Sequence, residues 1–146
     1  MAEENILNLM LNHHALLGAL LTLFKEELKT RGTMAKSSLA ELKWETQKHF
    51  FSEENAIFDF VQMENYGVLE MINQLKDEHI AMLNILNRFL NNIDAITDEE
   101  VEKFSNLLES HREIEEQKLY PKLDKELPYD QKMQIISRVN EIPLTK

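Results

Sequence analysis

The sequence predicts an all-α protein: an antiparallel up-down-up-down four-helix bundle with a short C-terminal fifth helix. Apolar residues recur at seven-residue intervals, as they do along one face of a helix. Glycine and proline number only 3 each among 146 residues, which disfavours a turn-rich β fold. The segments between the periodic stretches are short, so neighbouring helices should run antiparallel.

The first helix is expected over residues 4–31, with Gly32 as its natural stop. Two rows form its inward face: Leu7, His14, Leu21 and Leu28, and Met10, Leu17 and Phe24. After a loop over residues 33–38, Ser38-Leu39-Ala40-Glu41 has the capping-box form that opens a helix. The second helix should therefore run from Ser38 to about Glu64, with Asn65-Tyr66-Gly67 as its end.

The inward face of this second helix carries Leu42, Thr46, His49, Glu53, Ile57 and Phe60. The third helix is expected over residues 68–91, with Ile72, Leu75, His79, Met82, Leu86 and Phe89 facing inward. A connection over residues 92–96 leads to a second capping box, Thr97-Asp98-Glu99-Glu100.

The fourth helix should continue to about Lys122, where Pro121 near its last turn would kink it. Its inward stripe is Phe104, Leu108, His111, Glu115 and Leu119. Beyond Pro128, the spacing of Met133, Ile136 and Val139 predicts the short fifth helix, lying across the bundle.

The second half of the chain repeats the first. His14 aligns with His79, and the pair His49 and Glu53 aligns with the pair His111 and Glu115. The members of each pair are four residues apart, so they share one helix face. The repeat predicts two helical hairpins related by a pseudo-twofold axis, and a group on that axis would receive the same ligands from both halves.

Four imidazoles and two carboxylates in one core are costly to bury unless something compensates them. A lone inward histidine is more often a hydrogen-bonded core residue, and a single His/Glu pair is more often a surface contact. Their joint occurrence favours a metal site instead. The predicted metal ligands are His14, His49, Glu53, His79, His111 and Glu115. His13 is the alternative ligand on the first helix, although the leucine stripe favours His14.

Histidine and carboxylate without thiolate suit iron, manganese or zinc. Two octahedral ions offer about twelve positions, of which four histidines, two bridging glutamates and a bridging oxide or hydroxide fill about ten. Ferritin-like bundles use the motif Glu-x-x-His, but no acidic residue stands three positions before any of the four histidines. A ferritin-like di-iron bundle is therefore disfavoured. Glu54 and Glu116 should either face solvent or contact a metal ligand without binding the metal themselves. Glu78 and Glu113 should lie on solvated faces.

Composition limits the partners. The chain has 16 basic and 26 acidic residues, a net charge of -10 and no cysteine. This charge argues against nucleic acid and anionic membrane as partners, and the lack of cysteine excludes disulfides. The N-terminus lacks the basic flank of a signal peptide, and Glu or Lys interrupts each apolar run before membrane-spanning length. We expect a cytoplasmic protein with a single domain over residues 1–146.

These residues resemble the haemerythrin or HHE cation-binding family over nearly the whole chain. The match is carried by Asn12-His13-His14-Ala15-Leu16-Leu17, the His49/Glu53 pair, Glu78-His79, and His111-x-x-x-Glu115-Glu116 followed by Leu119-Tyr120-Pro121. The resemblance implies a four-helix bundle that holds a non-haem di-iron centre, with the four histidines as terminal ligands and the two glutamates as bridges.

Two features differ from the oxygen-carrying haemerythrins. Those proteins have another histidine one turn before the third-helix ligand, where this chain has Leu75, and they space the fourth-helix pair as His-x-x-x-x-Asp. The four-histidine, two-glutamate set is similar to the iron–sulfur-cluster repair branch, associated with nitric oxide and oxidative stress. Many members of that branch carry a cysteine pair that this chain lacks.

We therefore expect a binding protein rather than an enzyme. Its two iron ions, joined by an oxide or hydroxide, would take up O2, NO or peroxide for sensing, scavenging or storage. One alternative is an iron donor to a damaged iron–sulfur protein. Another is a peroxidase-like or NO-reducing enzyme served by a reductase.

Overall fold

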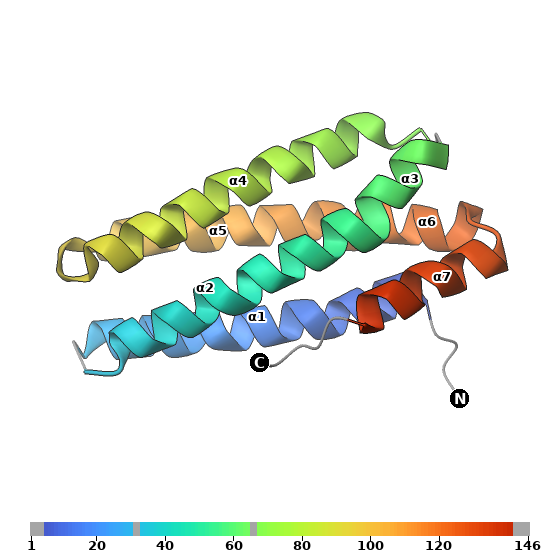
Figure 1. The fold of residues 1–146 in the computed structure, drawn as a ribbon. Coiled ribbons are helices and arrows are strands. Elements are labelled where there is room, and N and C mark those ends of the chain that lie inside the picture. Colours follow the sequence, from blue (N-terminus) through green and yellow to red (C-terminus); the bar gives the residue numbers. More distant parts are fainter. Residues whose placement is uncertain (1–4, 31–32, 65–66, 142–146) are drawn as a thin grey trace.

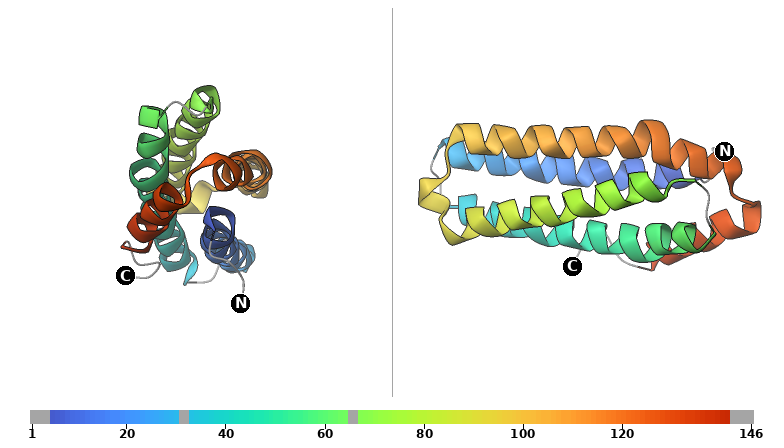
Figure 2. Two further views of the ribbon diagram at one scale, coloured as in Figure 1. Left: turned by 90° about the vertical axis from the view of Figure 1, so that its right-hand side faces the viewer. Right: turned by 90° about the horizontal axis from the view of Figure 1, so that it is seen from above.

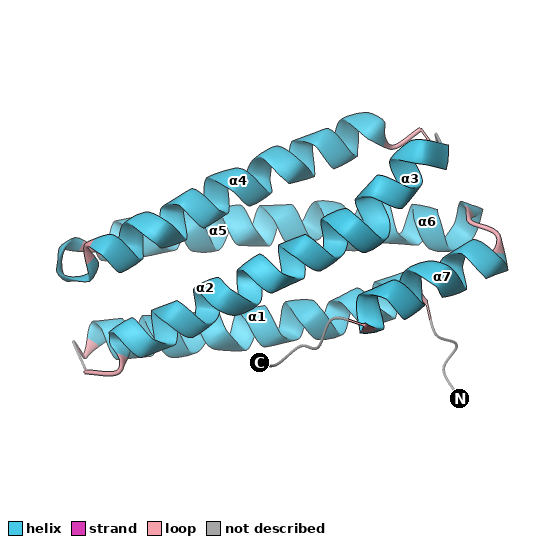
Figure 3. Ribbon diagram, viewed as in Figure 1, coloured by secondary structure: helices cyan, strands magenta, loops and turns pink. Residues whose placement is uncertain are grey.

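The computed structural model describes residues 5–30, 33–64 and 67–141. Within these ranges the chain is helical, with short loops and no strand (Figure 3). The predicted all-α class is therefore confirmed. Two predicted signals, Gly32 as a helix stop and Asn65-Tyr66 at the end of the second helix, lie outside the described residues.

Four long helical runs and one shorter helix make up the fold. In chain order the elements are α1 (Ile6–Lys29), α2 (Ala35–Ser52), the π turn η1 (Glu53–Phe58), α3 (Asp59–Glu64), α4 (Leu69–Asn91), the 3-10 turn η2 (Ile93–Ala95), α5 (Asp98–Ile114), the π turn η3 (Glu115–Leu119), α6 (Tyr120–Glu126) and α7 (Tyr129–Asn140).

The long runs lie side by side along one axis. In Figure 1, α1 runs from right to left, α2 and α3 return to the right, α4 runs back to the left, and α5 and α6 return. Contacts join α1 to α2, α2 to α4, and α4 to α5, and they close the circuit between α1 and both α5 and α6. The end-on view in Figure 2 shows these runs surrounding a common interior. At one end α7 turns back to contact α1 and η1.

Capping explains one helix start and corrects another. The predicted capping box at Thr97 is confirmed, because Thr97 Oγ1 accepts from the Glu100 backbone N–H and the Glu100 carboxylate accepts from the Thr97 N–H. The predicted capping box at Ser38 is wrong. The helix begins at Ala35, so Ser38 lies within the helix and not at its N-cap, and its side chain is buried. Gly67, after the second run, has the positive φ of 75° that favours glycine.

The second and fourth runs are not the uninterrupted α-helices that the sequence predicts. Each contains one π turn, which begins at Glu53 in one run and at Glu115 in the other. Pro121 does not end the fourth run, which continues to Glu126. It falls in the first turn of α6, directly after the π turn, where the regular ladder of hydrogen bonds is already interrupted.

The apolar core has two parts. One cluster lies toward α7 and includes Ile6, Met10, Ile57, Leu75, Leu119, Leu123 and Ile135. The other lies toward the opposite end and includes Leu21, Phe24, Leu42, Met82, Leu86, Phe104 and Leu108. Along each long run, the inward histidine lies near the boundary between the residues of these two clusters. The polar ligands therefore occupy a layer between two apolar ones.

One helix has the length and composition of a membrane span. The α1 segment Ile6–Lys29 reaches a mean hydropathy of 1.4 over an 18-residue window, contrary to the expectation that charges interrupt every apolar run. Its buried face, however, packs in both apolar clusters and carries His14. A core helix of this kind passes the same test.

Candidate metal centre

The structure brings all six predicted ligands together in the middle layer, and each side chain is at most 4 % exposed. They form two groups that share both glutamates. The group with His14 and His49 is called the first pocket, and the group with His79 and His111 is called the second pocket. Within each group the ligand atoms lie within 4.8 Å of one another.

Each histidine directs Nε2 at a shared carboxylate. In the first pocket, His14 Nε2 lies 3.0 Å from Glu115 Oε1 and His49 Nε2 lies 3.5 Å from Glu53 Oε1. In the second pocket, His79 Nε2 lies 3.0 Å from Glu53 Oε1 and His111 Nε2 lies 3.2 Å from Glu115 Oε2. Two atoms that bind one transition metal at about 2.1 Å and at a right angle lie about 3 Å apart, so these spacings suit shared cations.

These ligand atoms have nothing else to bind. The four Nε2 atoms, Glu53 Oε1 and both carboxylate oxygens of Glu115 are buried without a hydrogen-bond partner among the described residues. Buried polar atoms are nearly always satisfied, so such a concentration needs an explanation. Cations bound to imidazole nitrogen and carboxylate oxygen would satisfy all of them, which is why the residues present fit a metal centre.

The other ring nitrogen of each histidine, Nδ1, contacts a side chain outside the set of six predicted ligands. His14 Nδ1 lies 2.6 Å from Glu116 Oε2, His79 Nδ1 lies 2.7 Å from Glu54 Oε2, and His111 Nδ1 lies 2.7 Å from Glu78 Oε1. His49 differs, because its Nδ1 lies 3.2 Å from Nδ1 of His13. The carboxylate contacts fix the proton on Nδ1 of His14, His79 and His111 and leave their Nε2 atoms free for a metal.

Two sequence-based interpretations change as a result. Glu78 is not on a solvated face, because it holds His111 across the interface between α4 and α5. Sequence reasoning missed this role because a contact between neighbouring helices leaves no mark in the periodicity of either one. His13 is 5 % exposed and hydrogen-bonded to the His49 ring, so it stands behind a predicted ligand rather than among the ligand groups.

Tyr120 is a further member of the centre that sequence reasoning missed. Its hydroxyl donates to Glu53 Oε2, and its side chain is fully buried. The repeat aligns it with Phe58, whose ring stacks near His79 as the Tyr120 ring lies near His14. The hydroxyl is thus a departure from the repeat: it occupies one oxygen of Glu53, whereas both oxygens of Glu115 face the pockets.

The pKa values of four buried histidines are shifted in different directions. Burial lowers the pKa of His13 to about 4 and that of His49 well below its usual 6.5. Burial also opposes the charge of His111, yet the charge and close approach of Glu115 outweigh burial and raise the pKa of His111 to about 9. The pKa of His14 is likewise raised, since the close approach and charge of Glu115 and the other nearby carboxylates outweigh burial.

The pKa values of Glu115 and Tyr120 are shifted in opposite directions. Burial would raise the pKa of Glu115, but its close polar contacts with Glu53, His111 and His14 and the charge of His111 hold that pKa well below its usual value. Burial and the charges of Glu115 and Glu53 raise the pKa of Tyr120 far above its usual value, so the phenol keeps its proton and donates it. Glu115, with its lowered pKa, thus lies beside two histidines with raised pKa values, His14 and His111, and bound cations would replace the protons of these two histidines.

Both glutamates of the centre open a π turn. Such turns are rare, and they occur often at functional sites. Glu53 is the first residue of η1 and Glu115 the first residue of η3, four residues after His49 and His111 respectively. The next residue in each π turn is also a glutamate. Glu54 contacts His79 and Glu116 contacts His14, in each case on a different run. Each π turn therefore carries one predicted ligand and one glutamate that contacts another predicted ligand.

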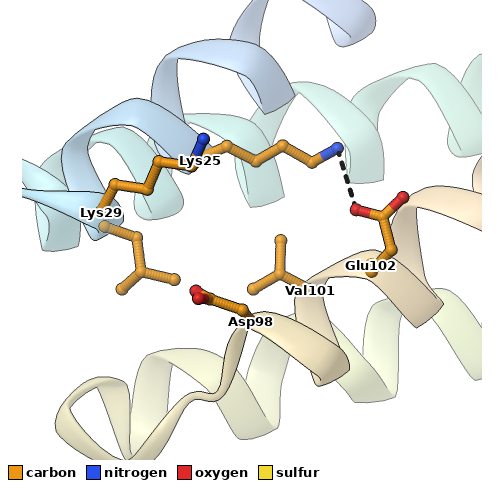
Figure 4. A pocket seen from close by; sticks show the side chains of 6 residues that line it. Lys25, Lys29, Asp98, Val101 and Glu102 are labelled. Carbon is orange, nitrogen blue, oxygen red and sulfur yellow. Dashed lines mark ion pairs between the residues drawn. The ribbon is translucent and has the colours of Figure 1, made fainter.

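One surface pocket lies elsewhere. It is lined by Lys25, Leu28, Lys29, Asp98, Val101 and Glu102, between the end of α1 and the start of α5, with an ion pair of 3.9 Å from Lys25 Nζ to Glu102 Oε2 (Figure 4). None of the predicted metal ligands lines it. Two of its lining residues, Leu28 and Val101, belong to the apolar cluster farther from α7.

The family comparison agrees with this geometry. The model of the haemerythrin HHE cation-binding domain matches residues 5–123, which cover α1 to most of α6 and include every ligand named above. This protein belongs to the haemerythrin HHE cation-binding family. No curated protein and no solved structure gave a match.

Proposed function

We propose that this protein is a cytoplasmic non-haem di-iron protein that binds O2, NO or peroxide for sensing, scavenging or storage. In this proposal the long runs form the antiparallel four-helix bundle expected from the sequence. The four histidines are terminal ligands, and Glu53 and Glu115 bridge two iron ions together with an oxide or hydroxide. The chain binds neither nucleic acid nor membrane.

One observation carries the proposal: two histidine pairs share the same two buried glutamates. A single ion would need only one of the groups, and a hydrogen-bonded core would not leave seven ligand atoms without partners. The choice of iron over manganese or zinc rests on the family resemblance, because all three accept imidazole and carboxylate.

The surroundings favour a small ligand. Apolar clusters lie on both sides of the ligand layer, and His14 and Glu115 are 3 % and 0 % exposed. The four histidines and two shared glutamates also leave about one coordination position open on each ion. When bound, iron would supply a redox-active Lewis acid. The protein's part is to orient the imidazoles, fix the carboxylates and exclude bulk water.

A second candidate is an iron donor for the repair of iron–sulfur clusters. The open coordination positions favour it, because an incompletely coordinated ion is more easily released. This reading requires that iron leave the protein during reactivation of a damaged iron–sulfur protein. Steady turnover of peroxide or NO with a reductase would instead identify an enzyme.

Metal analysis with spectroscopy tests the proposal. Anaerobic loading with Fe2+ should give about two irons per chain, and oxidation should produce the near-ultraviolet absorption of an oxo-bridged ferric pair. Addition of O2 or NO to the reduced protein, or of peroxide to the oxidised protein, should then change the absorption spectrum of that form reversibly. A content below about one iron per chain would contradict the di-iron assignment.

A further inference from the structure

The two pockets have the same ligands but different surroundings. The repeat places His13 immediately before His14 where it places Glu78 immediately before His79. Each of these residues supports a ligand on a neighbouring run, His49 for His13 and His111 for Glu78. In the first pocket, Nδ1 of His49 thus contacts an imidazole, whereas in the second pocket Nδ1 of His111 contacts a carboxylate.

A second difference points the same way. The carboxylate of Glu116, which holds His14, also lies 3.8 Å from Nε of Arg112. The repeat places Phe50 at the position equivalent to Arg112, and Phe50 stacks on the His79 ring at 3.8 Å between centroids. Among the ion pairs of the described residues, none joins Glu54 or Glu78 to a lysine or arginine.

The charge behind the two pockets is therefore unequal. Behind the first pocket, Glu116 contributes one negative charge, Arg112 offsets it, and His13 contributes none. Behind the second pocket, Glu54 and Glu78 contribute two negative charges, and Gln74, which donates to Glu78 at 3.0 Å, is neutral. A carboxylate behind a histidine raises the basicity of the ligand nitrogen and strengthens its bond to a cation.

We infer that the second pocket binds its cation more tightly than the first, so that one ion of the pair is firmly held and the other is exchangeable. This inference rests on the proposed metal centre and assigns an order to its two positions. Supporting contacts of this kind change metal affinity by about ten- to a hundredfold. The first equivalent of Fe2+ should therefore enter between His79 and His111.

Anomalous diffraction from crystals loaded anaerobically with one equivalent of Fe2+ tests the order directly. The expected result is density in the second pocket, with the first pocket filling only when a second equivalent is added. Density in the first pocket, or equal density in both, would overturn the inference. Failure to bind Fe2+ in either pocket would contradict the proposed function itself, so the two failures are distinguishable.

Three substitutions test the cause. Arg112→Gln removes the cation beside Glu116, and His13→Glu restores the carboxylate that the repeat predicts; each should narrow the gap between the two Fe2+ affinities. Glu78→His is the reciprocal change, and it should also narrow the gap by weakening the second pocket. Titration of the metal-free variants with Fe2+ measures both affinities, and circular dichroism checks the helices. An unchanged gap in both Arg112→Gln and Glu78→His would overturn the proposed cause.

Discussion

Tyr120 donates a hydrogen bond to Glu53, and this contact links α6 to the first residue of η1. It engages Oε2 of the carboxylate, while Oε1 is the oxygen that approaches His49 and His79. The phenol therefore determines which oxygen of Glu53 faces the pockets. No equivalent donor acts on Glu115, whose two oxygens are without hydrogen-bond partners among the described residues.

Replacing Tyr120 by Phe should destabilise the metal-free protein more than the loaded protein. The change leaves Glu53 Oε2 buried and unpaired, which costs about 1–3 kcal/mol of unfolding free energy. A bound cation can take up the freed oxygen and offset part of that loss. Denaturant unfolding with and without Fe2+ measures the difference. Tyr129→Phe is the control, because Tyr129 is 70 % exposed; equal effects of the two substitutions would contradict the role of Tyr120.

Glu115 and Glu116 should respond differently to substitution. Glu115→Ala removes the carboxylate that reaches both pockets, so most of the iron should be lost. Glu116→Ala removes only the support behind His14, and the iron should remain bound with an affinity lower by about ten- to a hundredfold. Metal content after gel filtration compares the two variants. Equal retention of iron by both would exclude Glu115 as a shared ligand.

Glu78→Ala should weaken metal binding although Glu78 is not a ligand. Without its carboxylate, the Nδ1–H of His111 loses its acceptor and the ring is free to turn. The expected loss is about ten- to a hundredfold in affinity for Fe2+, measured by competition with a chelator. Glu113→Ala is the matched control, since Glu113 is exposed on the neighbouring run. If both variants bound Fe2+ with the affinity of the unaltered protein, the contact between Glu78 and His111 would have no role in metal binding.

Phe104 tests the apolar cluster farther from α7. It is 1 % exposed and packs against Phe89, with 6.4 Å between ring centroids. Phe104→Ala should lower the unfolding free energy by about 3–5 kcal/mol, because it removes a large buried ring and leaves a cavity. Leu23→Ala, at a position 43 % exposed, should change it far less. Chemical denaturation gives both values, and the iron content of folded Phe104→Ala should stay the same.

The metal-free protein should lose stability as the pH rises. Despite burial, Glu115 raises the pKa of His111 in the folded chain to about 9, against 6.5 for an ordinary histidine. A histidine whose pKa is higher in the folded state stabilises the fold fully below pH 6.5, and this contribution is lost as the pH rises through about 9. Melting temperatures over this range measure the loss. His111→Asn should flatten the slope, and an unchanged slope would contradict the assignment.

The fold and the ligand layer could be predicted from sequence because both depend on spacing along single helices. The seven-residue rhythm located the long runs, and the four-residue separation of His49 from Glu53 placed both on one face. Contacts between runs leave no such pattern. The roles of Glu78 and Tyr120 depend on which residue of another helix stands opposite, so periodicity could not reveal them.

Local hydrogen bonding was also hidden from the sequence. Ser38 has the residue type and spacing of a helix cap, yet the helix begins one turn earlier because that turn buries Ala35 in the core. The π turns have no composition of their own, and the stretch from Glu53 to Phe58 reads as ordinary amphipathic helix. Only the three-dimensional packing distinguishes these cases.

The π turns also give the chain a strict length requirement. Each turn connects a segment that carries a predicted metal ligand to an apolar segment that packs near α7, such as the segment with Val61 after η1. One residue deleted within the turn would rotate everything downstream by about 100° relative to everything upstream. Val61 would leave the core, or Glu53 would leave the pockets. The number of residues between ligand and core is therefore as constrained as their identity, and we expect relatives to vary in side chains here but not in length.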